Sequence, residues 1–110
     1  MKLPNGGQAF IDERKIIEYC LSEEHDEGKH KAHLFRRLVG IGVDNAERLL
    51  DALSEAAAGA DAAPGKRDHY GQRYTIDFIL HGPRGTATVR SVWIVRTGEQ
   101  FPRLVSCFIL

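Results

Sequence analysis

Two long segments of alternating apolar and polar side chains, joined by a short turn, restrict the fold more than any other feature of this sequence. The first, 73–81, has its large apolar residues at every second position: Tyr74, Ile76, Phe78 and Leu80. The second, 86–96, keeps this period around Trp93. A period of two is that of a strand buried on one face. Because Gly82-Pro83-Arg84-Gly85 between the segments is typical of a hairpin turn, the sequence predicts a long antiparallel hairpin.

A third strand is predicted near the C-terminus. The chain turns at Thr97-Gly98-Glu99-Gln100, the strand starts at Pro102, and 104–110 is nearly continuous apolar sequence. Such a run, apolar on both faces, is typical of a central or well-covered strand. The segment 60–72 contains Pro64-Gly65 and a polar run, and we expect it to be a loop.

The first half of the chain has the longer period of helices. Asp12 is a suitable N-cap for a first helix, and Gly40 can end a second one over 29–39. A third helix starts at Asp44, whose spacing to Glu47 is that of a capping box, and runs to about 58. The residues expected to face inward are Ile16, Ile17, Cys20 and Leu21 in the first, Leu34, Phe35, Leu38 and Val39 in the second, and Ala46, Leu49, Leu50, Leu53 and Ala57 in the third.

Helices followed by a meander of strands indicate an α+β fold. We expect one domain over 1–110, with two to three N-terminal helices (about 12–58) packed on one face of a three- to four-stranded antiparallel β-sheet (about 72–110). The opposite face would then present polar, partly cationic side chains, which suits a ligand. These are Arg73, Thr75, Asp77, Thr88 and Arg90.

The charges are balanced overall but unevenly distributed. Lys and Arg together number 15, as do Asp and Glu, so net charge does not identify a partner. However, 12–27 is mostly acidic, whereas 29–37 is basic and contains no acid. This separation can attract a polyanion locally. Alternatively, the charges can form internal salt bridges, or the basic residues can simply lie on a solvated helix face. The side chains expected to contact RNA are Lys29, Arg36, Arg37 and Arg73.

Other classes of protein find little support in the sequence. Cys20 and Cys107 are far apart in apolar surroundings, and we expect them to be buried free thiols. His25, His30 and His33 are zinc-ligand types close to Cys20, but their spacing matches no zinc motif, so no metal and no cofactor is expected. No apolar run is long enough for a signal peptide or a membrane span, and we therefore expect a cytoplasmic protein with no membrane contact.

Short motifs are spread over nearly the whole chain. They are Leu3-Pro4-Asn5, Glu24-His25, Gly28-x-x-Lys31-Ala32-x-x-Phe35, Tyr70-Gly71-x-x-Tyr74-x-x-Asp77, Val89-Arg90-x-x-Trp93-Ile94-x-x-x-Gly98 and Pro102-Arg103-Leu104-Val105. In these the chain resembles a small, largely uncharacterised family of bacterial domains, found free-standing and as C-terminal modules of polymorphic toxins, including modules attached to phage-head-like proteins. The toxin modules are similar to the barnase, EndoU, colicin and RelE group of metal-independent ribonucleases. That similarity implies helices packed on an antiparallel sheet, with the active site on the sheet.

The resemblance also implies site residues. The matching motif positions are His25, Lys31, Tyr74, Asp77, Arg90 and Trp93, with Ser106 where toxin-like relatives tend to have Thr. This chain departs from those relatives at Cys107-Phe108-Ile109-Leu110, where they often have Thr-Ala-Tyr-Pro.

Metal-free RNA cleavage requires a base for the 2′-hydroxyl, an acid for the leaving oxygen and cations for the developing phosphorane charge. Lys31 or Arg90 would stabilise that charge. His30 or His25 would exchange protons, and Ser106 or Tyr74 would orient a phosphate oxygen. The predicted catalytic residues are Lys31, His30, Arg90, Ser106 and Asp77.

Each of these residues also has a purely structural interpretation. Lys31 can pair with Glu27 or Asp77, and Arg90 can form an ordinary cross-strand pair with Asp77. Large rings such as Trp93 and Tyr74 usually fill cores. A serine in an apolar strand, such as Ser106, is often bonded to backbone.

The sequence therefore favours a toxin-type, metal-independent ribonuclease domain. It would act in the cytoplasm, or in the cytoplasm of a target cell if it is part of a secreted toxin. The partners expected are RNA and a neutralising protein. The alternative is a non-enzymatic binding module that contacts an immunity or antitoxin-like protein, or a nucleic acid. An accessory structural protein is a third hypothesis, and the oligomeric state is not predicted.

Overall fold

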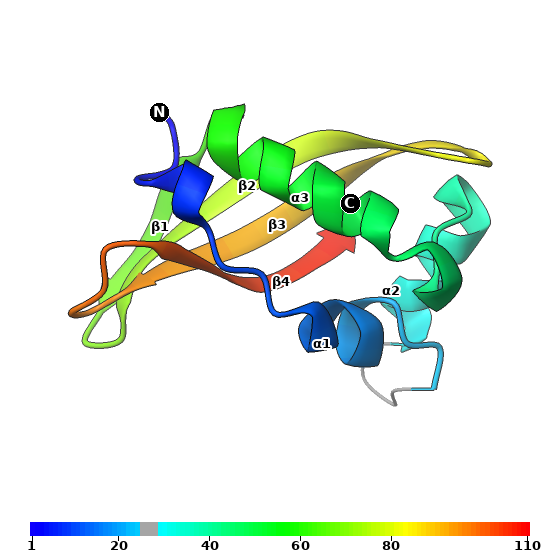
Figure 1. Cartoon of the computed structure of the whole chain (residues 1–110), viewed down its shortest axis with the longest axis horizontal. Coiled ribbons are helices and arrows are strands. Elements are labelled where there is room, and N and C mark those ends of the chain that lie inside the picture. Colours follow the sequence, from blue (N-terminus) through cyan, green and yellow to red (C-terminus); the bar gives the residue numbers. More distant parts are fainter. Residues whose placement is uncertain (25–28) are drawn as a thin grey trace.

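The computed structural model describes residues 1–24 and 29–110, with helical segments first and a four-stranded antiparallel sheet after them (Figure 1). The helical segments are η1 (Gly6–Gln8), α1 (Glu13–Lys15), η2 (Ile16–Cys20), α2 (Lys29–Leu34), η3 (Phe35–Val39), η4 (Val43–Asn45) and α3 (Glu47–Gly59). The strands are β1 (Ala63–Asp68), β2 (Gly71–Gly82), β3 (Gly85–Arg96) and β4 (Pro102–Ile109), adjacent in the order β1-β2-β3-β4. The predicted α+β fold is confirmed.

The hairpin of β2 and β3 is the longest pairing in the sheet. Its register is continuous from Gly71 opposite Arg96 to Gly82 opposite Gly85. Tyr74 lies opposite Trp93, and the alternation predicted from the sequence assigns these rings to the same face of the sheet. Beyond β3, the pairing with β4 shifts register between Val92 and Trp93, a bulge next to Val105.

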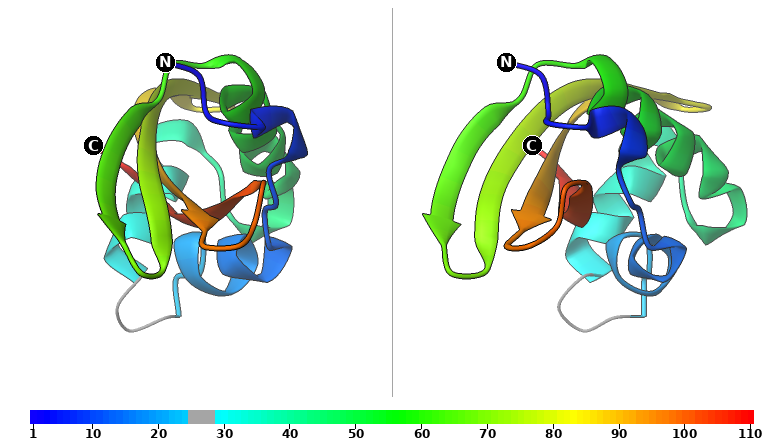
Figure 2. Two further views of the ribbon diagram at one scale, coloured as in Figure 1. Left: turned by 90° about the vertical axis from the view of Figure 1, so that its left-hand side faces the viewer. Right: turned by 60° about the vertical axis from the view of Figure 1, so that its left-hand side comes forward.

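The helices pack on one face of the sheet, which we call the inner face (Figure 2). One continuous core joins the inner face to the helices. Its large members include Ile76, Leu80, Val89, Trp93 and Leu104 from the strands and Ile16, Phe35, Val39, Leu49 and Leu53 from the helical segments. The other face, here the outer face, is the one that the helices leave open (Figure 2).

The prediction of a loop over 60–72 is wrong, because 63–68 forms the edge strand β1. Asp68 accepts a hydrogen bond from the Tyr70 amide (3.0 Å) and closes the turn into β2. The register shifts between Pro64 and Arg67, and an edge strand with a bulge tolerates a proline. Most of β1 is exposed, so its sequence has none of the apolar alternation that identifies a strand.

The prediction that Ile17 and Leu38 face inward is also wrong, since they are 37% and 41% exposed. They lie in η2 and η3, which are π-helical. In η2 the Leu21 amide donates to the Ile16 carbonyl (2.8 Å), five residues back. Because this turn is wider than that of an α-helix, Ile16, Cys20 and Leu21 share the buried face and Ile17 turns outward.

The predicted cap of the third helix is wrong as well. Asp44 forms an ion pair with Arg36 (2.5 Å) and does not cap the helix. Asn45 instead holds the preceding turn, accepting from the Gly42 amide (2.8 Å) and donating to the Gly40 carbonyl (2.9 Å). Gly40 has a φ of 74°, as expected for a glycine that ends a helix.

A short hydrogen-bond chain fixes the largest ring of the core. Trp93 is 0% exposed, and its indole N–H donates to the Ser91 hydroxyl (2.8 Å). That hydroxyl donates to the Ile76 carbonyl (2.9 Å) on the neighbouring strand. Ser91 thereby satisfies the one polar group of a buried indole.

We expect Ser91→Ala to destabilise the fold by about 1–3 kcal/mol, because it leaves the Trp93 N–H unsatisfied in the core. Urea unfolding followed by tryptophan fluorescence measures this change. Ser54→Ala, at an exposed position, is the matched control. Equal stability of the two variants would contradict the assigned role of Ser91.

We expect Gly82→Ala to destabilise the fold by about 1–3 kcal/mol or more, as overpacking does. A Cβ at Gly82 would lie 2.1 Å from the Val39 carbonyl oxygen, a backbone atom that moves only with η3. Thermal unfolding measures the melting temperatures of Gly82→Ala and of the control Gly59→Ala, whose added Cβ meets no atom within 4 Å. A melting temperature for Gly82→Ala equal to that of the control would show that η3 is not seated on this turn.

Candidate functional site

Three strands place charged and aromatic side chains side by side on the outer face. Asp77 lies opposite Arg90, and Arg90 lies opposite Phe108, so the three share one face of the sheet. Arg90 donates from Nε and Nη2 to the two carboxylate oxygens of Asp77, both at 2.8 Å. The Lys31 ammonium lies 4.7 Å from the centre of the Phe108 ring. We call Lys31, Phe108, Arg90 and Asp77 the charged row.

The position of α2 brings Lys31 to the sheet. α2 contacts β4, and its buried residue Ala32 and the following Phe35 anchor it to the core. Lys31 is exposed, and its stem extends over Phe108 at the edge of the sheet. Phe108 thus has Lys31 of the basic segment over its ring and Arg90 of the hairpin opposite it on the neighbouring strand.

The salt bridge in the charged row is open to solvent. The Arg90 and Asp77 side chains are 42% and 40% exposed. The hydrogen bonds from Arg90 hold the pKa of Asp77 below its usual value, and the same bonds raise the pKa of Arg90. A guanidinium has five N–H donors, so Arg90 keeps donors for a further anion.

The two other predicted catalytic residues flank the row. His30 is exposed and adjacent to Lys31 in α2. Ser106 is half-buried on β4, two residues before Phe108 and opposite Val92. Ser106 is also one of the groups that lower the pKa of the Cys20 thiol.

Cys20 and Cys107 are both buried free thiols, as predicted. A hydrogen bond from Cys107, together with that from Ser106, lowers the pKa of Cys20. The same contact with Cys20, and burial, raise the pKa of Cys107. Their place in the core makes them packing residues.

The basic segment does not form one cationic patch. Arg36 pairs with Asp44, away from the sheet, and His33 lies 3.7 Å from Glu23. Within residues 1–24 and 29–110, Lys29 and Arg37 make no salt bridge. Among the described residues, the cations of the segment outside these salt bridges are therefore Lys29, Lys31 and Arg37.

The remaining family-motif residues have other positions. Trp93 lies in the core and Tyr74, half-buried, packs against it, both on the inner face. His25 lies outside the described residues. Among the described residues, no group of three or more His, Cys, Asp or Glu side chains could hold a metal ion.

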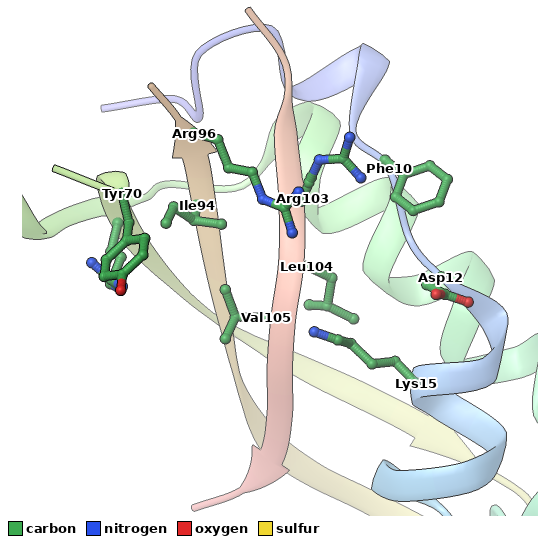
Figure 3. A pocket seen from close by; sticks show the side chains of 10 residues that line it. Phe10, Asp12, Lys15, Tyr70, Ile94, Arg96, Arg103, Leu104 and Val105 are labelled. Atoms are coloured by element: carbon green, nitrogen blue, oxygen red, sulfur yellow. The ribbon is translucent and has the colours of Figure 1, made fainter. Parts of the chain in front are cut away.

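A hollow of about 320 Å³ lies on the outer face at the other end of the strands (Figure 3). Four cations, Lys15, Arg73, Arg96 and Arg103, line it together with the rings of Phe10 and Tyr70. We call this the cationic pocket. Of its cations the sequence predicted only Arg73; Arg96 shares the alternation of Arg90 along β3 and could have been found by that signal. Nothing in the sequence indicates that Lys15, from α1, lines the pocket, where its side chain extends toward β4 (Figure 3).

None of the described helices has the length and apolar character needed to cross a bilayer.

A comparison with solved structures supports the fold. One chain of a contact-dependent growth inhibition toxin–immunity protein complex from Klebsiella pneumoniae 342 matches with a TM-score of 0.69 and 16% sequence identity. The match covers 91% of this chain and 98% of that chain. At this identity the likeness establishes a shared fold. A search of curated proteins found no match.

A family model also matches almost the whole sequence, over residues 2–110. Its description is a domain of unknown function, DUF6883. The motifs that run from Leu3 to Val105 therefore lie within one family match, and the chain belongs to the DUF6883 family.

Proposed function

We propose that this domain is a toxin-type ribonuclease that binds and cleaves RNA on the outer face of its sheet without a metal ion. The charged row is the observation on which the proposal depends. It brings Lys31 and Arg90, from different halves of the chain, together on an open surface. Two cations at one site are what a pentacoordinate phosphorane needs, since its charge grows as the 2′-oxygen attacks.

The charged residues of the row and the flanking His30 and Ser106 each have a chemical role in this proposal. Arg90, held by Asp77, presents its remaining N–H donors to a non-bridging phosphate oxygen, and Lys31 adds a second charge. His30 exchanges the proton of the 2′-hydroxyl or of the leaving 5′-oxygen, and a water molecule exchanges the other proton. Ser106 orients the phosphate. The products would be a 2′,3′-cyclic phosphate and a 5′-hydroxyl.

The fold comparison supports the proposal from another direction. The matched structure is, by its title, a complex of a growth inhibition toxin with an immunity protein. A fold shared over 91% of this chain is consistent with a role in such a system.

A second candidate is a binding module that contacts a protein partner through the same face. The observation in its favour is that Arg90 and Asp77 already neutralise each other, which an interface can use as a fixed polar contact. The matched title names both a toxin and an immunity protein, which fits this candidate as well.

Expression in bacterial cells separates the two candidates. We expect the wild type to arrest growth and fragment total RNA, and Lys31→Ala plus Arg90→Ala to relieve both effects, because the variant lacks both phosphate-stabilising cations. Arg48→Ala, which removes an exposed cation from α3, is the control and should stay toxic. Circular dichroism checks that each variant folds. Normal growth with intact RNA at high soluble expression of the wild type would overturn the ribonuclease proposal and favour the binding module.

Purified protein tests the chemistry directly. We expect cleavage of an RNA oligonucleotide to continue in excess EDTA and to stop when the oligonucleotide is 2′-O-methylated, because the 2′-hydroxyl is the nucleophile. Lys31→Ala should lower the rate at least about a hundredfold, the usual effect of removing one stabiliser of transition-state charge. Gel electrophoresis with end-group analysis measures both. Loss of cleavage in EDTA would contradict the metal-independent mechanism.

A further inference from the structure

We propose that the cationic pocket binds a phosphodiester and a neighbouring unpaired base of single-stranded RNA, at a subsite separate from the charged row. The inference rests on the proposed function for its choice of RNA, but the observations behind it concern other residues. The pocket is built from β2, β3, β4 and the segment around α1, and it shares no residue with the row.

Two of the pocket cations are paired with carboxylates. Arg103 donates to both carboxylate oxygens of Glu99 (2.9 and 2.8 Å), and its guanidinium lies over the Phe10 and Phe101 rings at 5.1 and 4.9 Å. Arg73 donates to Asp68 from Nη1 (3.1 Å). Both side chains are therefore fixed in place before any ligand arrives.

The two other cations are not neutralised by such a pair. In the described part of the chain, neither Lys15 nor Arg96 takes part in a salt bridge. Asp12 also lines the pocket, but it pairs with Arg14. In Figure 3 the Lys15 ammonium and the Arg96 guanidinium both extend toward the space in front of β4. The pocket thus has an excess of positive charge at its mouth, which suits one phosphate group.

The pocket also offers surfaces for a base. Tyr70 is 61% exposed at its rim, and Phe10 lies on the opposite side (Figure 3). Its floor includes Ile94, which is 8% exposed although it lies opposite Arg73 on the outer face. Cations next to an exposed ring and an apolar floor are the usual elements of single-strand recognition. A volume of about 320 Å³ is at the small end of ligand sites, which suits one nucleotide.

The subsite is aligned with the charged row. Along β3, Arg90 belongs to the row, while Ile94 and Arg96 line the pocket. Arg90 and Arg96 are six residues apart, or about 20 Å along an extended strand. An RNA strand that follows β3 would reach both sites. The pocket would then select and hold the strand, and the row would act on it.

Fluorescence anisotropy with a labelled, 2′-O-methylated RNA oligonucleotide measures binding in the absence of cleavage. We expect Lys15→Ala plus Arg96→Ala to weaken binding about tenfold or more at low salt. The slope of log K against log salt should fall by about 0.7, as expected when one neutralised phosphate of a single strand is lost. The control is Lys2→Ala plus Arg48→Ala, on or beside α3, which removes the same charge and should bind like the wild type. Circular dichroism confirms that both variants fold.

A second pair of variants tests the base contact. We expect Tyr70→Ala to weaken binding at least about fivefold, and Tyr70→Phe, which keeps the stacking ring, to bind like the wild type. Weaker binding of a double-stranded RNA of equal length would support the preference for an unpaired base.

Binding that is unchanged in the Lys15→Ala plus Arg96→Ala variant, or reduced equally in its control, would overturn the subsite. Failure of the wild type to bind the oligonucleotide would do the same. These outcomes are distinct from failure of the proposed function. RNA cleavage that depends on Lys31 and Arg90, without an effect of Lys15 and Arg96 on binding, would leave the ribonuclease proposal standing and remove the subsite. Binding that depends on Lys15 and Arg96, without any cleavage, would support the subsite and overturn the ribonuclease proposal.

Discussion

Burial of Trp93 is the constraint on which the remaining structure depends. Side chains alternate between the two faces of a strand. Burial of this ring under the helices therefore determines on which face each of the remaining side chains of the β2–β3 hairpin lies. Ser91 makes the burial possible by accepting the indole N–H. With Trp93 inside, Arg90, Ile94 and Arg96 must lie on the outer face. The same packing therefore determines both the core and the candidate site.

The helices add what the hairpin lacks. α2 contacts β4 and places Lys31 over Phe108. α1 contributes Lys15 to the lining of the cationic pocket. Each is anchored by buried neighbours, Ala32 and Phe35 for one and Ile16 for the other. The outer face thus receives cations from both ends of the chain, although the protein as a whole has balanced charge.

The sequence predicted the hairpin and the third helix, and it allowed the pairing of Arg90 with Asp77 as one interpretation, because each follows from a local period or a register. It did not reveal β1, whose exposed residues have no apolar alternation, or the outward turn of Ile17 and Leu38, which depends on π-helical hydrogen bonds. The contact between Lys31 and Phe108 is likewise tertiary. Most of the cationic pocket was missed for the same reason, since Phe10, Lys15 and Tyr70 reach it from loops and a short helix.

The central claim is that RNA binds the outer face of the sheet. Side-chain NMR of the arginine Nε–H groups during titration with 2′-O-methylated RNA tests it most directly, because arginines lie on both sides of the molecule. The signals of Arg90, Arg73, Arg96 and Arg103 should shift, while those of Arg48 on α3 and of the buried Trp93 indole should not. Shifts confined to Arg48 and Arg14, or no shifts at any RNA concentration, would contradict the account.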